Sequence, residues 1–193
     1  MESKEIPILA FESAAAFEAW LEAHENEQAG LWLRIAKKDS GLPTVTYDQA
    51  LDAALCFGWI DGQKGKGDET TWLQRFLPRR PRSGWSKVNR EKVERLITEG
   101  RMREGGQRQI DAAKADGRWD AAYDPQSKAT VPEDLQEALD ANPKAAAFFL
   151  TLKSANRYAI LYRIQTAKKA ETRSTRIATI VGMLERGETF HPQ

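Results

Sequence analysis

Apolar and polar residues follow two spacings along the first half of the chain, and these spacings predict helices and strands. In residues 13–25, apolar side chains recur at helical spacing behind Ser13, a residue type that caps helix N-termini, so we predict a helix. Residues 31–36 alternate between apolar and polar side chains, which predicts a strand with one buried side. Residues 71–77 are predicted to form a second strand.

Cap and turn residues predict where the next elements begin and end. Thr46 followed by Gln49 forms a capping box, so a second helix is expected over 47–57, with a glycine directly after it. Residues 62–69 hold three glycines and several charges and are predicted to be a loop. The short segment between this helix and this loop is expected on a turn or a short strand.

Beyond residue 85 the pattern is mostly helical, and this change sets the predicted fold class. The stretch 118–129 is irregular and contains Pro125, so we place a boundary there. The chain is therefore predicted to be an α+β protein, with a mixed α/β domain of a few strands over 1–125 and a helical module over 126–193. The predicted helices of this half cover 87–99, 105–115, the segment from a capping box at 130–133 to Asn142, 143–152, a segment capped by Ser154, and 172–186.

The charges are arranged in blocks of opposite sign, although the net charge of the whole chain is only +1. Residues 1–61 hold 4 Lys/Arg and 11 Asp/Glu, whereas residues 62–103 hold 12 Lys/Arg and 5 Asp/Glu. Such blocks either pair with each other in the folded chain or leave a basic surface for an anionic partner. The isoelectric point near 7.8 argues against a dedicated, strongly basic nucleic-acid binder.

The sequence carries no signal for a membrane or a secretory location. It has no apolar run of about 18 residues, and its polar beginning, Met1 to Glu5, does not resemble a signal peptide. The single cysteine, Cys56, excludes an internal disulfide and fits a reducing cytosol. We therefore predict a cytoplasmic protein without a membrane partner.

Residues with recognisable catalytic or metal-binding chemistry are few. Cys56 shares no motif with His24 or His191, the two histidines, so neither a Cys–His nucleophile nor an ordinary zinc site is predicted. The glycines match no phosphate-binding loop, and no cofactor is predicted. Asp61 is either a general base or ligand acceptor, or a turn residue whose carboxylate accepts hydrogen bonds from nearby backbone N–H groups. Whether the protein is an enzyme stays open.

The densest group of candidate binding residues lies in and around the basic, proline-rich stretch 75–90. The prolines stiffen the backbone that displays the arginines, and Trp85, beside a glycine at a helix start, is expected to be exposed. That helix N-terminus, next to arginines, suits an anion. Alternatively, the arginines pair with the acidic N-terminal block and Trp85 fills the core. The candidate ligand-binding residues here are Trp59, Asp61, Trp72, Arg75, Arg79, Arg80, Trp85, Ser86 and Asn89.

Arg173 and Arg176 add a second candidate anion site near the end of the chain. They are predicted in the first turn of the last helix, where positive charge opposes the helix dipole. Both also lie at the edge of that helix's buried stripe, so each should have an anionic partner. The partner is either a carboxylate of the acidic N-terminal part, which would link the two modules, or a bound anion.

Motifs spread over residues 30–187 carry a family resemblance: Tyr47–Leu51, Ala54–Gly62, Arg75–Phe76, Pro78–Arg79, Ser83–Lys87 with Asn89, Gly117–Trp119, Ala121–Tyr123, Ala167–Lys168, Thr172–Arg173 and Arg176–Ile177. Together they resemble the YdeI/OmpD-associated family, described as bacteriocin-protection proteins. The resemblance implies a bacterial, cytoplasmic protein with an α/β N-terminal part, a helical C-terminal part and a role in stress or bacteriocin protection. It implies no established reaction, so no catalytic residue is carried over.

These observations favour one function and leave others open. The favoured hypothesis is a binder of a small anionic or aromatic ligand, in a cleft lined by tryptophan and arginine. It expects Trp59, Asp61, Arg79 and Trp85 to line one cleft. The alternative is a nucleic-acid-binding protein that uses the basic segment 62–103. An enzyme with Asp61 as acid or base is a third hypothesis, and the oligomeric state is not predicted.

Overall fold

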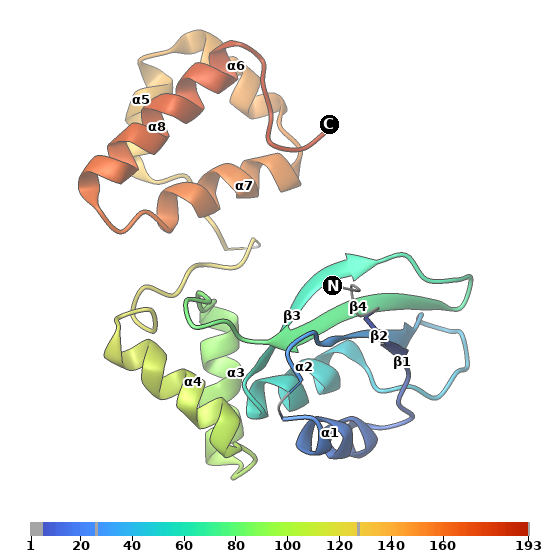
Figure 1. The fold of residues 1–193 in the computed structure, drawn as a ribbon. Helices are drawn as coiled ribbons and strands as arrows, with labels where there is room; N and C mark the ends of the chain where they lie inside the picture. Colours follow the sequence, from blue (N-terminus) through green and yellow to red (C-terminus); the bar gives the residue numbers. More distant parts are fainter. Residues whose placement is uncertain (1–5, 26, 127, 193) are drawn as a thin grey trace, which may run out of the picture. The chain divides into compact units, whose positions relative to one another are not determined.

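The computed structural model describes residues 6–25, 27–126 and 128–192, and its contacts divide the chain into two compact units. The first, which we call the N-terminal unit, runs to Trp85 and resumes over 89–120. The second, the helical unit, comprises residues 86–88 and the chain from Ala121 onward. Figure 1 shows both units.

The N-terminal unit contains a four-stranded mixed sheet, in the order β1-β2-β4-β3. The short β1 (Ile8–Leu9) runs parallel to β2 (Leu31–Ala36), and β4 (Thr71–Pro78) is antiparallel to both β2 and β3 (Trp59–Gly65). The alternation predicted for β2 is confirmed, because every second residue from Leu31 is buried. The sheet and the helices described below confirm the α+β fold class.

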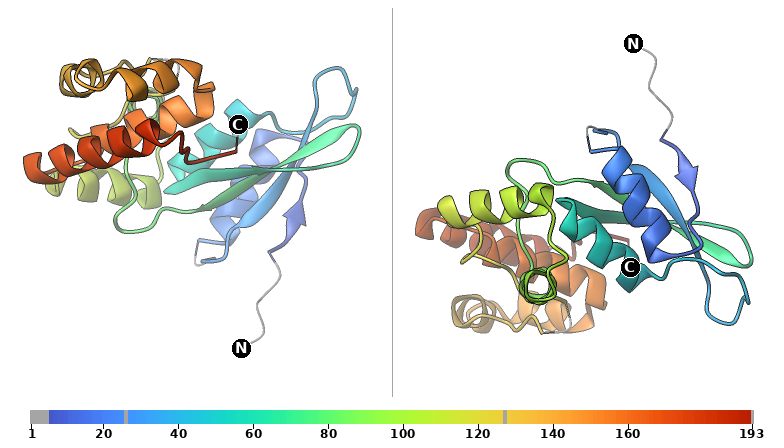
Figure 2. Two further views of the ribbon diagram at one scale, coloured as in Figure 1. Left: turned by 90° about the horizontal axis from the view of Figure 1, so that it is seen from above. Right: turned by 90° about the horizontal axis from the view of Figure 1, so that it is seen from below.

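Two helices cover one face of the sheet, as Figures 1 and 2 show from three sides. They are α1 (Ala14–Ala23) and α2 (Tyr47–Cys56). Both N-termini are capped as predicted: the Ser13 hydroxyl accepts from a backbone N–H at 3.2 Å, and Thr46 and Gln49 form a reciprocal capping box. The core beneath the sheet is built from Phe17, Leu21, Leu31, Leu33, Ile35, Leu51, Ala54, Leu55 and Phe76.

The prediction of a loop over 62–69 is wrong for residues 62–65, because β3 continues to Gly65. The strand pairs with β4 across an irregularity between Asp61 and Lys64. As an edge strand it has only one paired side, and its polar side chains project into solvent, so glycines and charges are tolerated there. Strand β1 was not predicted, since two residues are too few for a detectable alternation.

The helices α3 (Lys87–Thr98) and α4 (Glu104–Ala115) follow the sheet in the chain. The start of α4 lies directly against the end of α2: a Cβ atom added to Gly106 would lie 2.3 Å from the Cys56 carbonyl oxygen. Cys56 itself is only 2% exposed, and burial raises the pKa of its thiol to about 11. This thiol is therefore protonated and shielded at neutral pH.

The helical unit consists of α5 (Glu133–Asp140), α6 (Pro143–Thr151), α7 (Ser154–Gln165) and α8 (Ala170–Glu185). Figure 1 shows these helices grouped around a common interior. Their apolar faces form one core of Leu135, Leu139, Ala145, Phe149, Leu152, Ile160, Leu161, Ile164, Ile177, Ile180 and Leu184.

Helix boundaries in this unit differ from the sequence prediction at three places. The capping box at 130–133 does not form, because α5 begins only at Glu133 behind Pro132, without a side-chain cap. Ser154 is the first residue of α7 rather than its cap. Helix α8 begins two residues before the predicted Thr172, at Ala170. Each difference is a shift of one or two residues, because cap residues in a sequence locate a helix end only approximately.

Candidate ligand-binding cleft

An open cleft of about 760 Å³ lies at one end of the sheet in the N-terminal unit. It is formed by the turn that follows β2, by the end of β3 and by the turn that leads into β4. We call it the lysine cleft, because four of its lining residues are lysines. The full lining is Lys37, Lys38, Lys64, Gly65, Lys66, Gly67, Asp68, Glu69 and Trp72.

Asp68 fixes the turn that carries one side of the lysine cleft. Its carboxylate accepts hydrogen bonds from the backbone N–H groups of Thr70 and Thr71 at 2.9 and 2.7 Å. Arg34 of β2 forms an ion pair with the same carboxylate at 2.7 Å. Hydrogen bonds from the Thr71 side chain and from the backbone N–H groups of Thr70 and Thr71 lower the pKa of the Asp68 carboxyl to about 2. The turn is therefore tied to the neighbouring strand, and one of the two carboxylates of the cleft is already neutralised.

The four lysines are exposed, and they differ in how they are held. The Lys37 ammonium donates to the Asp68 and Glu69 carbonyl oxygens at 2.7 and 3.2 Å. The Lys64 ammonium lies 4.3 Å from the centre of the Trp72 ring. Within the described part of the chain, Lys38 and Lys66 form no ion pair. The cleft thus has an excess of positive charge beside an aromatic wall.

Behind Trp72 lies a small polar group that includes the predicted Asp61. The Tyr47 and Trp72 rings are 6.1 Å apart, and the Tyr47 hydroxyl donates to an Asp61 carboxylate oxygen at 2.8 Å. Burial and the neighbouring Asp61 carboxylate raise the pKa of Tyr47, so its hydroxyl stays protonated at neutral pH. Asp61 therefore acts here as an acceptor that positions Tyr47.

Two of the predicted site residues lie away from the lysine cleft but still on the sheet. Trp59 is 2% exposed and packs edge-to-face against Trp20, with ring centres 5.8 Å apart. Arg75 points to the opposite face from Trp72, where its guanidinium lies 5.8 Å from the Trp32 ring and donates to the Ala29 carbonyl. These side chains do not line the cleft.

The predicted exposure of Trp85 is wrong, because the side chain is 2% exposed. The segment from Arg79 to Trp85 folds back on itself, so that the Arg79 guanidinium lies 3.7 Å from the Trp85 ring and donates to the Gly84 carbonyl at 3.1 Å. On its other side Trp85 packs against Trp119, a residue distant in the sequence, at 5.1 Å. Arg79 is itself only 5% exposed. Trp85 is therefore part of the core, as the alternative interpretation predicted, whereas Arg79 contacts the Trp85 ring and a backbone carbonyl.

The other predicted residues of this stretch, Arg80, Ser86 and Asn89, also lie outside the lysine cleft. Arg80 is exposed, and its backbone N–H donates to the Ser83 hydroxyl at 3.1 Å. Ser86 forms an isolated bridge with Tyr123, and Asn89 is buried in α3. Trp59, Asp61, Arg79 and Trp85 therefore do not line one cleft. The structure brings together Asp61 and Trp72 of the predicted residues, and adds Tyr47 and the lysines, which were not predicted.

Several cations of the basic segment 62–103 pair with the acidic N-terminal block. Lys92 and Arg95 of α3 both form ion pairs with Asp52 of α2. Arg101 forms an ion pair with Glu18 of α1 at 2.8 Å. Internal pairing of the two charge blocks is thus confirmed for this part of the segment.

Arg173 has a carboxylate partner as predicted, but the partner comes from its own unit. Two of its guanidinium nitrogens donate to the carboxylate of Asp134 in α5 at 2.5 and 2.8 Å. The prediction that a carboxylate of the N-terminal part pairs with Arg173 is therefore wrong. Arg176 lies beyond the first turn of α8 and donates to the Arg163 carbonyl at 2.5 Å.

Two protein families match separate segments of the chain. Residues 9–109 match the family described as Domain of unknown function (DUF8412), and residues 128–187 match the family described as Bacteriocin-protection, YdeI or OmpD-Associated. The YdeI/OmpD-associated resemblance is thus confirmed over the helical part. No curated protein and no solved structure matches the chain. Across residues 6–25, 27–126 and 128–192, no helix is long and apolar enough to cross a membrane.

Proposed function

We propose a function for this chain, which belongs to the family described as Domain of unknown function (DUF8412). Its lysine cleft binds a small anionic ligand that carries an aromatic ring. A nucleotide has this chemistry. The observation that carries the proposal is the position of Trp72 in one open cleft with Lys37, Lys38, Lys64 and Lys66.

The chemistry of the lining supports phosphate groups next to a stacked ring. Lysine ammonium groups are compact, hydrated charges that bind phosphate as point charges. Stacking of a base on tryptophan contributes about 1–3 kcal/mol, and each exposed lysine contact contributes about 0.2–1 kcal/mol. With four lysine contacts the midpoint of these ranges is about 4 kcal/mol, which corresponds to a Kd on the order of 1 mM. The cleft volume of about 760 Å³ also suits a small molecule.

Single-stranded nucleic acid is the alternative occupant of the same cleft, since it offers phosphates and stacked bases. It requires further cations along the strand. Lys92, Arg95 and Arg101 are paired with carboxylates, and Arg79 is buried, which reduces the phosphate contacts available outside the cleft. We therefore favour the small ligand over the nucleic acid.

The location of binding is testable by NMR, because the six tryptophans give six indole N–H signals. Titration of the ¹⁵N-labelled protein with ATP should shift the Trp72 signal, which a Trp72→Phe variant identifies. Inorganic triphosphate, which lacks the aromatic ring, and adenosine, which lacks the phosphates, should each bind more weakly than ATP. The signals of the buried Trp59 and Trp85 serve as internal controls. ATP that leaves the Trp72 signal in place, or that shifts all six signals alike, would contradict the proposal.

The proposal also includes a role in bacteriocin protection and a cytoplasmic location. A role in stress or bacteriocin protection is included because the description of the family matched by residues 128–187 names bacteriocin protection. Comparing bacteriocin survival of cells with and without the intact gene tests it. The cytoplasmic location predicted from the sequence stays a prediction, and cell fractionation tests it.

A further inference from the structure

A second open groove, of about 520 Å³, lies within the helical unit between α7 and α8. We call it the arginine groove. One wall comes from the end of α7, the other from one face of α8, and Phe190 of the segment that follows α8 closes one side. The lining is Tyr162, Arg163, Thr166, Thr175, Arg176, Thr179, Ile180, Met183 and Phe190.

The two arginines of this groove have no carboxylate partner among residues 6–25, 27–126 and 128–192. Other arginines of the helical unit are paired, Arg173 with Asp134 and Arg186 with Glu188. Among the residues that the structure describes, neither Arg163 nor Arg176 forms an ion pair. Two half-buried cations therefore line one groove without a counter-charge, and an anion bound between them would relieve their mutual repulsion.

Within the described part of the chain, most N–H groups of these two guanidiniums donate to no protein acceptor. One nitrogen of Arg163 donates to the Ala159 carbonyl at 3.0 Å. One nitrogen of Arg176 donates to the Arg163 carbonyl at 2.5 Å and lies 3.5 Å from the Thr166 hydroxyl. A guanidinium has five N–H donors in a planar fork, so both arginines keep donors for a carboxylate or a phosphate.

The threonines of the groove do not compete with the arginines for an anion. Their hydroxyl groups donate to carbonyl oxygens one helical turn earlier, at 2.8 Å for Thr166, 2.9 Å for Thr175 and 2.8 Å for Thr179. Their oxygens are thus left as acceptors, which suit a hydroxyl group of the ligand rather than its charge. Recognition of the anion rests on the arginines.

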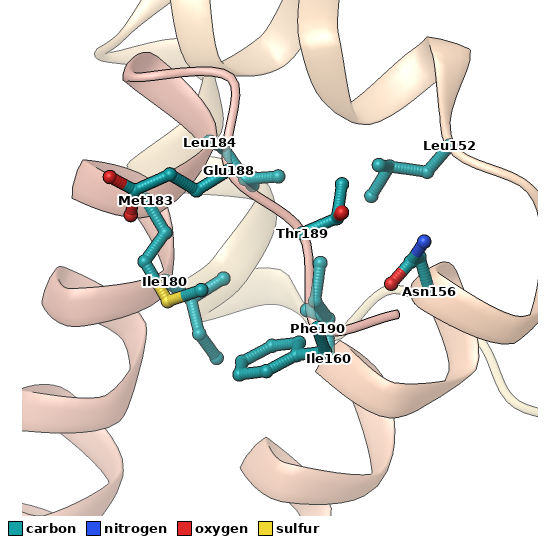
Figure 3. Close-up of a pocket in the computed structure, with 9 residues that line it drawn as sticks. All are labelled: Leu152, Asn156, Ile160, Ile180, Met183, Leu184, Glu188, Thr189 and Phe190. Carbon is teal, nitrogen blue, oxygen red and sulfur yellow. The ribbon is translucent and has the colours of Figure 1, made fainter. Parts of the chain in front are cut away.

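The other side of the groove is an apolar wall that is held firmly. Figure 3 shows the Phe190 ring beside Ile160 of α7 and near Ile180 and Met183 of α8. The pocket that Phe190 lines together with Ile160, Ile180 and Met183 has a volume of only about 10 Å³. Asn156, 2% exposed, anchors this segment by two hydrogen bonds to the His191 backbone at 2.9 and 2.8 Å. The Arg163 guanidinium lies 3.8 Å from the Phe190 ring.

We infer that the arginine groove is a binding site for a small organic acid, with a carboxylate or phosphate group held by Arg163 and Arg176 and an apolar or aromatic body against Ile180, Met183 and Phe190. This site is separate from the lysine cleft, because it lies in the helical unit and uses none of the residues of the cleft. Its arginine forks and apolar wall select a different ligand from the lysines and the Trp72 ring of the cleft.

Methyl NMR of methionine tests the site directly. The chain has three methionines, of which Met183 lines the groove, while Met102 lies beside Gly106 in the N-terminal unit. Phenyl phosphate added to the ¹³C-methyl-methionine-labelled full chain should shift the Met183 signal in a saturable way and leave the Met102 signal unchanged. Inorganic phosphate, which lacks the ring, and benzyl alcohol, which lacks the charge, should each bind more weakly. A Met183→Leu variant assigns the signal.

Three arginine variants separate recognition from general effects of charge. Arg163→Gln and Arg176→Gln should each weaken the binding of phenyl phosphate by about two- to fivefold, as expected for the loss of one partly exposed ionic contact. Arg157→Gln is the matched control: Arg157 is also in α7, lies 4.6 Å from the Phe149 ring and forms no ion pair in the described residues, but it is outside the groove. It should leave the affinity unchanged.

The outcomes distinguish the site from a merely structural pair of arginines. Because Arg176 also donates to the Arg163 carbonyl at the end of α7, its replacement lowers stability whether or not the groove binds an anion. If Arg176→Gln unfolds, the affinity of Arg163→Gln decides the test. The inference is overturned if phenyl phosphate leaves the Met183 signal unchanged, or if Arg163→Gln and Arg157→Gln bind phenyl phosphate equally well. An Asn156→Ala variant that stays folded should also weaken binding, because it releases the Phe190 wall.

Discussion

At the scale of single residues, Arg173 shows how the helical unit is tied together. Its guanidinium bonds to the Asp134 carboxylate of α5 and to the Ile164 carbonyl near the end of α7. One side chain of α8 therefore connects two other helices. The pair is only partly buried, with side-chain exposures of 29% for Arg173 and 44% for Asp134. Solvent screening of such a pair limits its contribution to stability.

Replacement of Arg173 by alanine should destabilise the helical unit by about 1 kcal/mol, well below the cost of breaking a fully buried pair. Far-UV circular dichroism during thermal unfolding measures this effect. Arg186→Ala is the control, because Arg186 also forms a two-bond pair, with Glu188, but both side chains are more exposed, at 60% and 49%. It should unfold like the parent. An Arg173→Ala protein that unfolds at the same temperature as the parent and Arg186→Ala would contradict the prediction.

The same pair makes a prediction about pH. The hydrogen bond from Arg173 holds the pKa of Asp134 below its ordinary value of about 3.9. A lowered folded-state pKa means that the stabilisation is complete above the ordinary value and is lost as the pH falls through the lowered pKa. The stability difference between the parent and Arg173→Ala should therefore be constant near neutral pH and shrink below about pH 4. A difference that grows in acid would contradict this assignment.

Only part of the candidate cleft was predictable from the sequence. Trp72 and Asp61 were among the predicted residues, because aromatic and acidic side chains near turns are recognisable by type. The lysines were not, although pairs at 37–38 and 64–66 flank the ends of strands. What brings them together is the pairing of β2 and β3 with β4, which local sequence does not encode. Trp85 was misjudged for the same reason, since its partner Trp119 is distant in the sequence.

At the scale of secondary-structure elements, the contact between α2 and α4 depends on the absence of side chains. A Cβ at Gly106 would lie 2.3 Å from the Cys56 carbonyl oxygen and 2.7 Å from the Leu55 carbonyl oxygen. Backbone atoms cannot move aside as the end of a flexible side chain can. The two helices would have to separate to admit even a methyl group.

Gly106→Ala should therefore destabilise the N-terminal unit by about 1–3 kcal/mol, the usual cost of overpacking. Tryptophan fluorescence during denaturation reports this unit, because all six tryptophans belong to it. Gly182→Ala is the matched control within α8: its Cβ would meet only the flexible end of Arg186, at 3.4 Å. That variant should gain about 0.5–1 kcal/mol by circular dichroism. A Gly106→Ala protein as stable as the parent would refute the close contact.

Helices and strands were predictable where the sequence pattern that specifies them spans only a few neighbouring residues. The caps at Ser13 and Thr46 and the alternation of β2 lie within a few residues of sequence, and all three are confirmed. The continuation of β3 to Gly65 depends on hydrogen bonds from β4, and the start of α5 depends on packing in the helical unit. Such dependence on distant partners explains why the loop over 62–69 and the capping box at 130–133 were wrong.

At the scale of the whole molecule, the two family matches fall on the two compact units. Residues 9–109 lie in the N-terminal unit except for residues 86–88, and residues 128–187 lie in the helical unit. The opposite charge blocks of the sequence meet inside the N-terminal unit, through Asp52 and Glu18. This internal pairing neutralises three cations of the basic segment, Lys92, Arg95 and Arg101. The lysine cleft is where uncompensated lysines gather beside an aromatic ring.

The central claim is that the lysines beside Trp72 bind an anionic aromatic ligand, and the affinity for ATP measured by calorimetry tests it most directly. A Lys64→Gln, Lys66→Gln double variant should bind ATP about fivefold more weakly than the parent, because two exposed ionic contacts are lost. The control is Lys114→Gln: the Lys114 ammonium lies 5.3 Å from the Trp119 ring, outside the cleft, and its loss should leave the affinity unchanged. Equal affinity in the parent, the double variant and the control would contradict the claim.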